Sequence, residues 1–221
     1  METAVERLET IRTRIETARR RFGPPPGVVK LIAVSKTFSA DEVRPFLDAG
    51  QRVFGENRVQ EAESKWPGLR AFYDGIELHL IGPLQSNKVR EAVALFDVIE
   101  TVDREKIAMA LKGEMDRQGR QPRVLVQVNI GQEPQKAGIS AAEAVSFVKR
   151  CREVHGLAID GLMAIPPEGE PPGPYFAHLA SLARDAGVAV LSMGMSGDFE
   201  TAIAMGATQV RVGSALFGQR A

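Results

Sequence analysis

The stretch Val29-Lys-Leu-Ile-Ala-Val-Ser35 is an apolar, β-branched run that predicts a buried strand, and Lys36 follows it directly. The next segment, Ala40–Ala49, has the spacing of a helix and ends at Gly50, a residue suited to the left-handed helix cap. This unit recurs along residues 28–218, with strand-like runs at Val29–Ser35, Arg52–Phe54, Glu77–Ile81, Asp97–Thr101, Arg123–Ile130, Ala158–Ala164, Val188–Ser192 and Gln209–Val212. Strands that alternate with helices predict parallel strands joined by right-handed crossovers.

The number of repeats favours a closed barrel. Eight strand–helix units fit a single (β/α)8 TIM barrel, and 221 residues suit one such domain of roughly 200–250 residues. An open, doubly wound α/β sheet is the alternative, but no G-x-G-x-x-G follows the first strand. We therefore expect one α/β domain over residues 1–221, with eight units in residues 28–218 and an extra helix in residues 1–22.

Residues 1–22 have the pattern of an amphipathic helix, because their apolar residues lie three or four positions apart. We expect Gly23 and Pro24–Pro26 to end this helix, since proline cannot continue the hydrogen-bond ladder. The apolar face could bind a partner helix in a coiled coil. The interpretation we favour is that it covers the body of its own domain.

Composition narrows the class of protein. Lys plus Arg and Asp plus Glu are 28 each, so no bulk charge favours nucleic acid or an anionic membrane. The single cysteine excludes an intrachain disulfide, and three scattered histidines argue against a zinc site, so we expect no metal. The sequence has neither an apolar leader nor a run of 18 apolar residues, which predicts a cytoplasmic protein without a membrane span.

Lys36 is the leading candidate for a chemically reactive side chain. Active sites of these barrels lie at the carboxyl ends of the strands, and Lys36 follows the first strand. Desolvation at the barrel mouth would lower a lysine pKa and favour the neutral amine, which forms a Schiff base with a carbonyl group. A structural ion pair with a carboxylate such as Glu56 is an equally weighted alternative.

Two turns of small residues follow the last two strands. They are Met193-Gly-Met-Ser-Gly-Asp198 and Arg211-Val-Gly-Ser-Ala215. Loops at these positions form the usual phosphate site of the barrel, because backbone N–H groups at helix starts point at an anion. Lys36 across from a phosphate cradle predicts a pyridoxal 5′-phosphate (PLP) site, in which Arg211 would face the ring nitrogen. An ion pair inside the barrel is the alternative for Arg211.

Seven blocks of this sequence resemble the pyridoxal phosphate homeostasis proteins, also called proline synthase co-transcribed homologues. They are Ala33-Val-Ser-Lys-Thr37, Phe54-Gly-Glu-Asn-Arg-Val-Gln-Glu61, His79-Leu-Ile-Gly-Pro-Leu-Gln-Ser-Asn-Lys88, Gln127-Val-Asn-Ile130, Gly161-Leu-Met-Ala164, Met193-Gly-Met-Ser196 and Arg211-Val-Gly-Ser-Ala-Leu-Phe-Gly218. The resemblance implies a fold-type III barrel similar to the N-terminal domain of alanine racemase. It also implies PLP held as an imine on Lys36, phosphate held by Ser196, Gly197, Gly213 and Ser214, Arg211 at the pyridine nitrogen, and a pocket lined by Asn57, His79 and Met163.

The choice between binder and enzyme depends on a second base. In barrel racemases, as the resemblance implies, a tyrosine from a partner's additional domain supplies it, and here the barrel uses the whole chain. Neither Tyr73 nor Tyr175 lies at a strand end. We therefore expect a monomeric PLP-binding protein of vitamin B6 homeostasis, without catalytic residues, that supplies PLP-dependent apo-enzymes.

Other functions stay open at this point. A PLP-dependent amino-acid racemase or related enzyme of low activity is the main alternative, and a class I aldolase without PLP is a third. Lys88 and Lys136 lie in or beside the matched blocks and could contact the phosphate or accept PLP, although solvated charges are the simpler interpretation.

Overall fold

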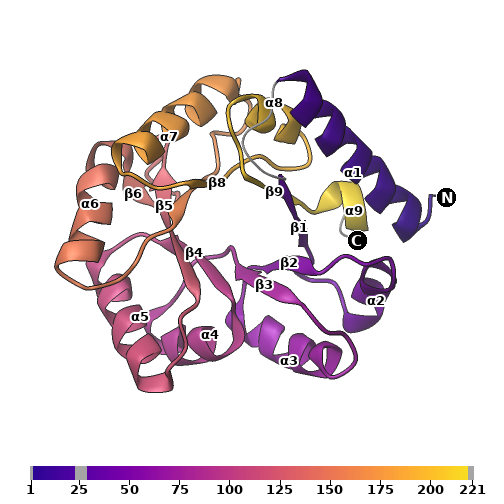
Figure 1. Cartoon of the computed structure of the whole chain (residues 1–221), viewed down its shortest axis with the longest axis horizontal. Coiled ribbons are helices and arrows are strands. Elements are labelled where there is room, and N and C mark those ends of the chain that lie inside the picture. The colour runs from indigo at the N-terminus through magenta and orange to yellow at the C-terminus, as the bar shows by residue number, and fades with distance from the viewer. Residues whose placement is uncertain (1, 23–28, 219–221) are drawn as a thin grey trace.

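The computed structural model describes residues 2–22 and 29–218, and its parallel strands close into a barrel (Figure 1). Among these residues the sheet has nine strands in the order β4-β3-β2-β1-β9-β8-β7-β5-β6, and pairing of β4 with β5 closes the ring. The strands are β1 (Lys30–Val34), β2 (Val53–Glu56), β3 (Glu77–Leu80), β4 (Val98–Val102), β5 (Arg123–Asn129), β6 (Ile139–Ser140), β7 (Gly161–Ala164), β8 (Val190–Ser192) and β9 (Gln209–Val212). The (β/α)8 barrel expected from the sequence is confirmed, and the open sheet is not formed.

The helices form an outer ring around the strands (Figure 1). They are α1 (Ala4–Arg21), α2 (Ala40–Asp48), α3 (Val59–Arg70), the 3-10 turn η1 (Ser86–Lys88), α4 (Val89–Leu95), α5 (Glu105–Gln118), α6 (Ala141–Glu153), α7 (Gly173–Asp185), α8 (Phe199–Ala204) and α9 (Ser214–Phe217). Strand β6 has two residues and pairs with β5 outside the ring of eight, a short addition that the sequence pattern does not reveal.

Local sequence explains where the helices begin and end. Ser39 caps α2 through a capping box with Glu42, which satisfies amide groups that have no partner inside the helix. Gly119 closes α5 in the left-handed region, with φ of 65°, and Gly50 follows α2 with φ of 81°. Glycine reaches this conformation without a steric penalty, so these residues end the helices just before β2 and β5.

Helix α1 lies on its own barrel. Its capping box joins Thr3 and Glu6, and its buried face consists of Leu8, Ile11, Ile15 and Ala18. This face packs beside α8 and α9, the elements that follow the last two barrel strands (Figure 1). The interpretation that α1 covers its own domain is therefore confirmed, and the apolar face is not left over for a coiled coil. The expected helix stop at Gly23 and Pro24–Pro26 lies outside the described residues.

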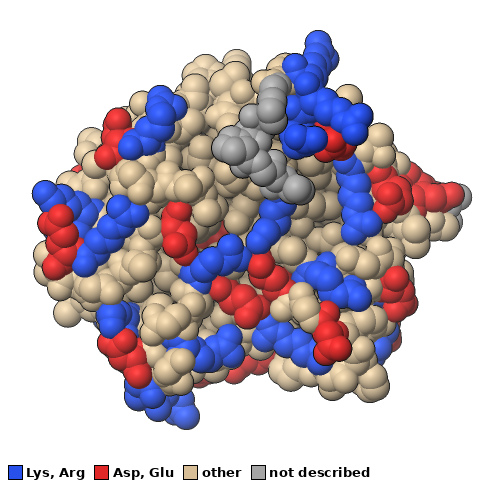
Figure 2. Space-filling view, in the orientation of Figure 1, with Lys and Arg blue, Asp and Glu red and all other residues tan. Residues whose placement is uncertain are grey.

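The core occupies two regions. Most buried apolar side chains lie between the strands and the surrounding helices, and a smaller group, Val98, Leu125 and Met163, packs separately. Buried polar and charged side chains include Glu56, His79, Glu100, Ser192 and Arg211. On the face shown in Figure 2, basic side chains alternate with acidic ones, as the equal numbers of the two charges suggest. None of the helices in residues 2–22 and 29–218 combines the length and the hydropathy of a transmembrane span.

Candidate functional site

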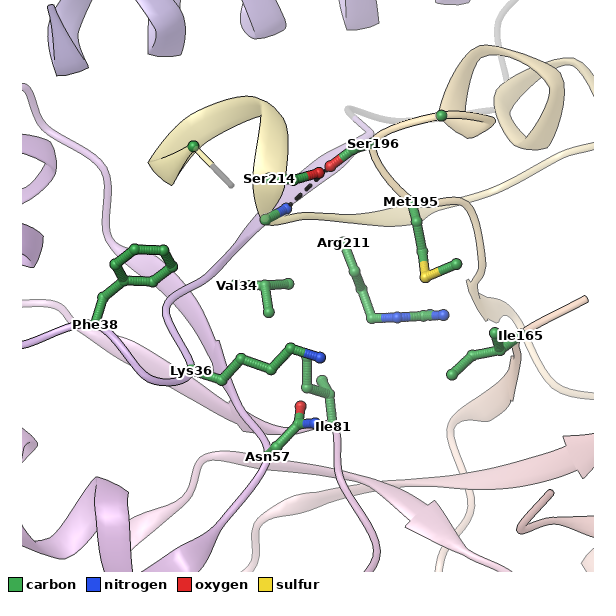
Figure 3. Close-up of a pocket in the computed structure, with 13 residues that line it drawn as sticks. Val34, Lys36, Phe38, Asn57, Ile81, Ile165, Met195, Ser196, Arg211 and Ser214 are labelled. Atoms are coloured by element: carbon green, nitrogen blue, oxygen red, sulfur yellow. Dashed lines mark hydrogen bonds between the residues drawn. The ribbon is translucent and has the colours of Figure 1, made fainter. Parts of the chain in front are cut away.

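A cavity of about 590 Å³ opens at the carboxyl ends of the barrel strands (Figure 3). Its walls come from residues that end or follow different strands, which the closed barrel brings together: Val34, Lys36, Phe38, Asn57, Ile81, Ile165, Met195, Ser196, Gly197, Arg211, Gly213, Ser214 and Gly218. Seven residues singled out from the sequence are in this set, namely Lys36, Asn57, Ser196, Gly197, Arg211, Gly213 and Ser214. The tertiary structure thus brings together positions that span almost 180 residues of sequence.

His79 and Met163 are not on the described wall, which corrects the expectation that they line the pocket. Both are fully buried within strands β3 and β7. Met163 packs against Val98 and Leu125, while both His79 ring nitrogens contact carboxylates. Residues that point inward from within a strand form layers below the barrel mouth, and in β3 the pocket residue is Ile81, just beyond the strand end.

Lys36 extends into the cavity from the turn after β1, toward the region where the Arg211 guanidinium lies (Figure 3). The turn is unusual, because Thr37 has φ of 70° although it is not glycine. A threonine rarely adopts this conformation, so surrounding contacts must hold it. The Thr37 amide donates to Glu61, and Lys65 Nζ donates to the carbonyl oxygens of Ser35 at 2.9 Å and Phe38 at 2.7 Å.

Glu56 helps to hold the turn that carries Lys36, because it contacts Lys65 and Ser35. Its Oε1 lies 2.7 Å from Lys65 Nζ and accepts hydrogen bonds from Ser35 Oγ at 2.8 Å and Trp66 Nε1 at 3.0 Å. Burial raises the pKa of the Glu56 carboxyl, and the charge of Lys65 and the hydrogen bonds act against that rise. Glu56 thus forms a buried ion pair with Lys65, next to the turn that carries Lys36.

The two turns of small residues meet at one side of the pocket. Ser196 Oγ accepts a hydrogen bond from the Gly213 amide at 3.3 Å (Figure 3). It also accepts one from the Ala215 amide at 3.4 Å, so the turn after β8 is joined to the start of α9. Gly194 permits the first turn, since its φ is 92° and an added Cβ would lie 2.6 Å from Ala202 Cβ. Hydroxyl and amide donors are therefore concentrated where the sequence predicts an anion.

Arg211 reaches the pocket from β9 and is only 4% exposed. Its Nη1 donates to Ser192 Oγ at 2.7 Å, and its Nη2 donates to the Ala164 carbonyl oxygen at 2.9 Å. Burial lowers the pKa of Arg211, while the negative charge of Glu100 acts in the opposite direction. A guanidinium stays charged in proteins, so a fixed cation lies beside the cavity.

Sequence reasoning missed two groups of residues. The first is the apolar part of the wall, formed by Val34, Phe38, Ile81, Ile165 and Met195. Three of these residues lie within the matched blocks, but nothing in the sequence pattern marks an apolar residue as part of the pocket. The second is the set of charged residues below the pocket, of which Glu100 had a readable signal. It is the one charged residue in the strand Val98-Ile-Glu-Thr-Val102, and a carboxylate in a fully buried strand implies a buried partner.

Lys88 and Lys136 are not among the residues that line this cavity. Lys88 Nζ lies 3.7 Å from Glu91, and Lys136 Nζ lies 2.5 Å from Glu133 and donates to the Pro166 carbonyl oxygen at 3.0 Å. Both lysines therefore take part in ion pairs at partly exposed positions, as the simpler interpretation of the sequence holds.

Comparison with known sequences gives a consistent result. The family described as "Alanine racemase, N-terminal domain" matches residues 7–221. The pyridoxal phosphate homeostasis protein of Escherichia coli (strain K12) is 40% identical over 237 residues, which cover 100% of this chain and 98% of that protein. The protein of the same name from Pseudomonas aeruginosa is 41% identical over 226 residues, covering 100% of this chain and 97% of that protein.

Solved structures agree with these relatives. PipY of Synechococcus elongatus PCC7942 without PLP has a TM-score of 0.86 and 38% identity, covering 98% of this chain and 100% of that chain. The structure of PipY with PLP bound has a TM-score of 0.83 at the same identity and coverage. An alanine racemase from Clostridium difficile has a TM-score of 0.69 with 15% identity, covering 96% of this chain and 57% of that chain, so that likeness concerns the fold alone.

Proposed function

The chain belongs to the pyridoxal phosphate homeostasis protein family, and on that premise we propose that it binds PLP in the pocket of Lys36 and Arg211 and acts in PLP homeostasis. The observation that carries this proposal is the convergence of Lys36, Arg211 and the Ser196 and Ser214 turns on one cavity. Each of these groups matches a different part of the cofactor.

The donor set of the pocket fits such a cofactor. PLP combines an aldehyde, an aromatic nitrogen and a phosphate, and a cavity of about 590 Å³ has room for a ring with these substituents. When bound, the cofactor supplies an aldehyde that condenses with a lysine amine to a Schiff base. Apolar side chains such as Ile81, Ile165 and Met195 line the wall of the same cavity, which suits an aromatic ring.

We assign the following roles to the residues of this chain. Lys36 provides the amine for the aldehyde, and Arg211 donates from its guanidinium to the ring nitrogen. Ser196, Gly197, Gly213 and Ser214 hold the phosphate through hydroxyl and backbone N–H groups. Ser196 and Gly197 lie in the turn that leads into α8, and Gly213 and Ser214 lie at the start of α9. Asn57 lines the pocket beside Lys36 (Figure 3).

The residues that line the cavity favour binding of the cofactor over catalytic turnover of a substrate. Among the described lining residues, the titratable side chains are Lys36 and Arg211, and a guanidinium does not accept a proton. A racemase needs a second base on the opposite face of the substrate carbon. Tyr73 donates to Asp48 and Tyr175 contacts Glu170, and neither tyrosine lines the cavity.

The setting of this function is part of the proposal. We propose that residues 1–221 act as one domain, as a cytoplasmic monomer that supplies PLP-dependent apo-enzymes. The buried face of α1 supports the monomer, because that apolar stripe packs against the chain's own α8 and α9.

The test is borohydride trapping on the purified protein. We expect the protein with PLP to absorb in the visible, to lose this absorbance with borohydride, and to carry a pyridoxyl adduct on the peptide that contains Lys36. Lys36→Ala should abolish the adduct, whereas Lys88→Ala, which alters a lysine outside the pocket, should leave it in place. A protein that stays colourless with added PLP would overturn the proposal.

Two further assays separate the alternatives. Chiral analysis after incubation of the loaded protein with L-alanine or L-serine tests for racemase activity, and turnover at an enzyme-like rate would contradict a homeostasis role. An aldolase that uses Lys36 without PLP would instead give a borohydride adduct with an aldehyde or ketone sugar phosphate in the absence of PLP.

A further inference from the structure

A chain of polar side chains, all buried except the half-buried Glu77, lies below the pocket and ends at Arg211. Arg211 Nη1 donates to Ser192 Oγ at 2.7 Å, and Ser192 Oγ in turn donates to Glu100 Oε2 at 2.5 Å. Glu100 Oε1 lies 2.6 Å from His79 Nδ1, and His79 Nε2 lies 2.6 Å from Glu77 Oε1. We call these five residues the barrel ladder. Their strands are β9, β8, β4 and β3, so the ladder crosses the inside of the barrel.

The ladder connects the two ends of the barrel. Glu77 is the first residue of β3, and its Oε1 also contacts Lys30 Nζ at 2.7 Å and Arg123 Nη2 at 2.8 Å, from the first residues of β1 and β5. Arg211, at the other end, lines the cavity at the carboxyl ends of the strands. A contact at the amino end of the barrel is thus joined to the pocket through hydrogen bonds alone.

The protons in the ladder are assigned by its chemistry. Ser192 has one hydroxyl proton, and since it accepts from Arg211 it donates that proton to Glu100. His79 faces a carboxylate oxygen with each ring nitrogen, and only the imidazolium donates at both. Burial lowers the pKa of His79, but the hydrogen bonds to Glu100 and Glu77 outweigh it and raise the pKa overall. Charges therefore alternate along the ladder as Arg⁺, Glu⁻, His⁺ and Glu⁻.

We propose that Glu100, held by His79 and Glu77, positions Arg211 by fixing the direction in which its guanidinium points. A buried guanidinium whose hydrogen-bond acceptors are not fixed can rotate toward any acceptor nearby. The ladder fixes one acceptor, Ser192 Oγ, because Glu100 holds the Ser192 hydroxyl in place. The Ala164 carbonyl oxygen accepts from Nη2, so two contacts at an angle hold the planar group. The remaining N–H groups of Arg211 then have a defined orientation toward the cavity.

This inference rests on the proposed function insofar as Arg211 faces the ring nitrogen of PLP, but the position of the guanidinium can be measured without PLP. The informative variants are Ser192→Ala, Glu100→Gln and Glu77→Gln, which interrupt the ladder at increasing distance from Arg211. Asp97→Asn is the matched control. Asp97 also pairs with an arginine near the amino end, at 2.5 Å from Arg70 Nη2. Its Oδ2 accepts from the Leu78 amide at 2.8 Å, a bond that an asparagine oxygen can keep, and no described hydrogen bond joins its side chain to a ladder side chain.

The first measurement is NMR of the arginine guanidinium groups in the protein without PLP, with the Arg211 signal assigned by its loss in Arg211→Lys. We expect Ser192→Ala and Glu100→Gln to shift or broaden this signal, Glu77→Gln to shift it less, and Asp97→Asn to leave it unchanged. An Arg211 signal that is the same in all four variants would overturn the proposal. Should Glu100→Gln fail to fold, the half-buried Glu77 and the hydroxyl of Ser192 still provide the test.

The second measurement is affinity, for PLP and for inorganic phosphate as separate probes. We expect Glu100→Gln to weaken PLP binding by about tenfold, the effect of losing one hydrogen bond to a charged group, and to leave phosphate binding within about twofold. If Glu100 acted through its charge alone, its neutralisation would tighten the binding of both anions, and that result would contradict a positioning role. Failure of the unmodified protein to bind PLP would overturn the proposed function, while the NMR result would still decide the role of the ladder.

Discussion

Lys65 Nζ on α3 donates a hydrogen bond of 2.9 Å to the carbonyl oxygen of Ser35, the residue that precedes Lys36. A second bond of 2.7 Å reaches the Phe38 carbonyl oxygen on the other side of the turn. The turn that carries Lys36 is therefore held at both ends by a buried lysine, which Glu56 neutralises at 2.7 Å. Rigid support of this kind places an amine where a cofactor can reach it.

Removal of this buried ammonium should destabilise the fold. Lys65→Met leaves Glu56 buried without its counter-charge, and we expect a loss of about 3–5 kcal/mol in the free energy of unfolding, measured by urea denaturation. Adding Glu56→Gln to this variant should restore part of the loss, because no uncompensated charge is then buried. Lys88→Met, at a partly exposed pair with Glu91, should change stability by less than about 1 kcal/mol. If the two lysine variants changed stability equally, that result would contradict a special structural role for Lys65.

Glu77 should contribute to stability in a defined pH range. Burial acts against its ionisation, but hydrogen bonds from His79 and Lys30 lower the pKa of Glu77 from 4.5 to about 2. A carboxylate with a lowered pKa stabilises the folded state above its unfolded pKa, and this contribution disappears as the pH falls from about 4.5 toward 2. The difference in unfolding free energy between the unmodified protein and Glu77→Gln should therefore shrink over this range, by at most about 3 kcal/mol. A difference that does not vary with pH would contradict the assignment.

Cys151 should be inert in the folded protein. It is fully buried on α6, and burial raises the pKa of its thiol to about 12. Because the thiolate is the reactive form, a thiol reagent at pH 8 should leave the native protein unmodified and label it completely in urea. The sequence has one cysteine, so the total labelling reports this residue alone. Rapid labelling without denaturant would show that α6 opens in the native state.

Two glycines in the turn after β8 should respond differently to the same substitution. Gly194→Ala places a Cβ 2.6 Å from Ala202 Cβ at a φ of 92°, so we expect a loss of at least about 1–2 kcal/mol in unfolding free energy. Gly197→Ala meets no atom within 4 Å and keeps the backbone N–H, so stability should stay within about 0.5 kcal/mol. Thermal denaturation of both variants checks this contrast. PLP affinity should fall in Gly194→Ala, since the turn that carries Ser196 is displaced.

Much of the fold follows from local pattern. The β-branched runs predict the strands, and residues such as Ser39 and Gly119 mark helix ends at the positions that the structure shows. Asp103 has the residue type of a helix cap, yet the cap of α5 is Arg104, because the exact start depends on how the loop leaves β4. Tertiary packing decides such details, and the two-residue strand β6 is another example.

Local hydrophobic spacing is enough to place a residue within the strand–helix repeat. It places Lys36 just after the first strand, Ser196 in the turn that follows β8, and Arg211 within the last strand. Closure of the barrel sets which inward-pointing residues reach the cavity and which lie beneath it. His79 lies in a lower layer because closure of the barrel and the stagger of its strands set the depth of each side chain. The partnership of Glu100 and Ser192, 92 positions apart, likewise exists only once β4 and β8 face each other across the barrel interior.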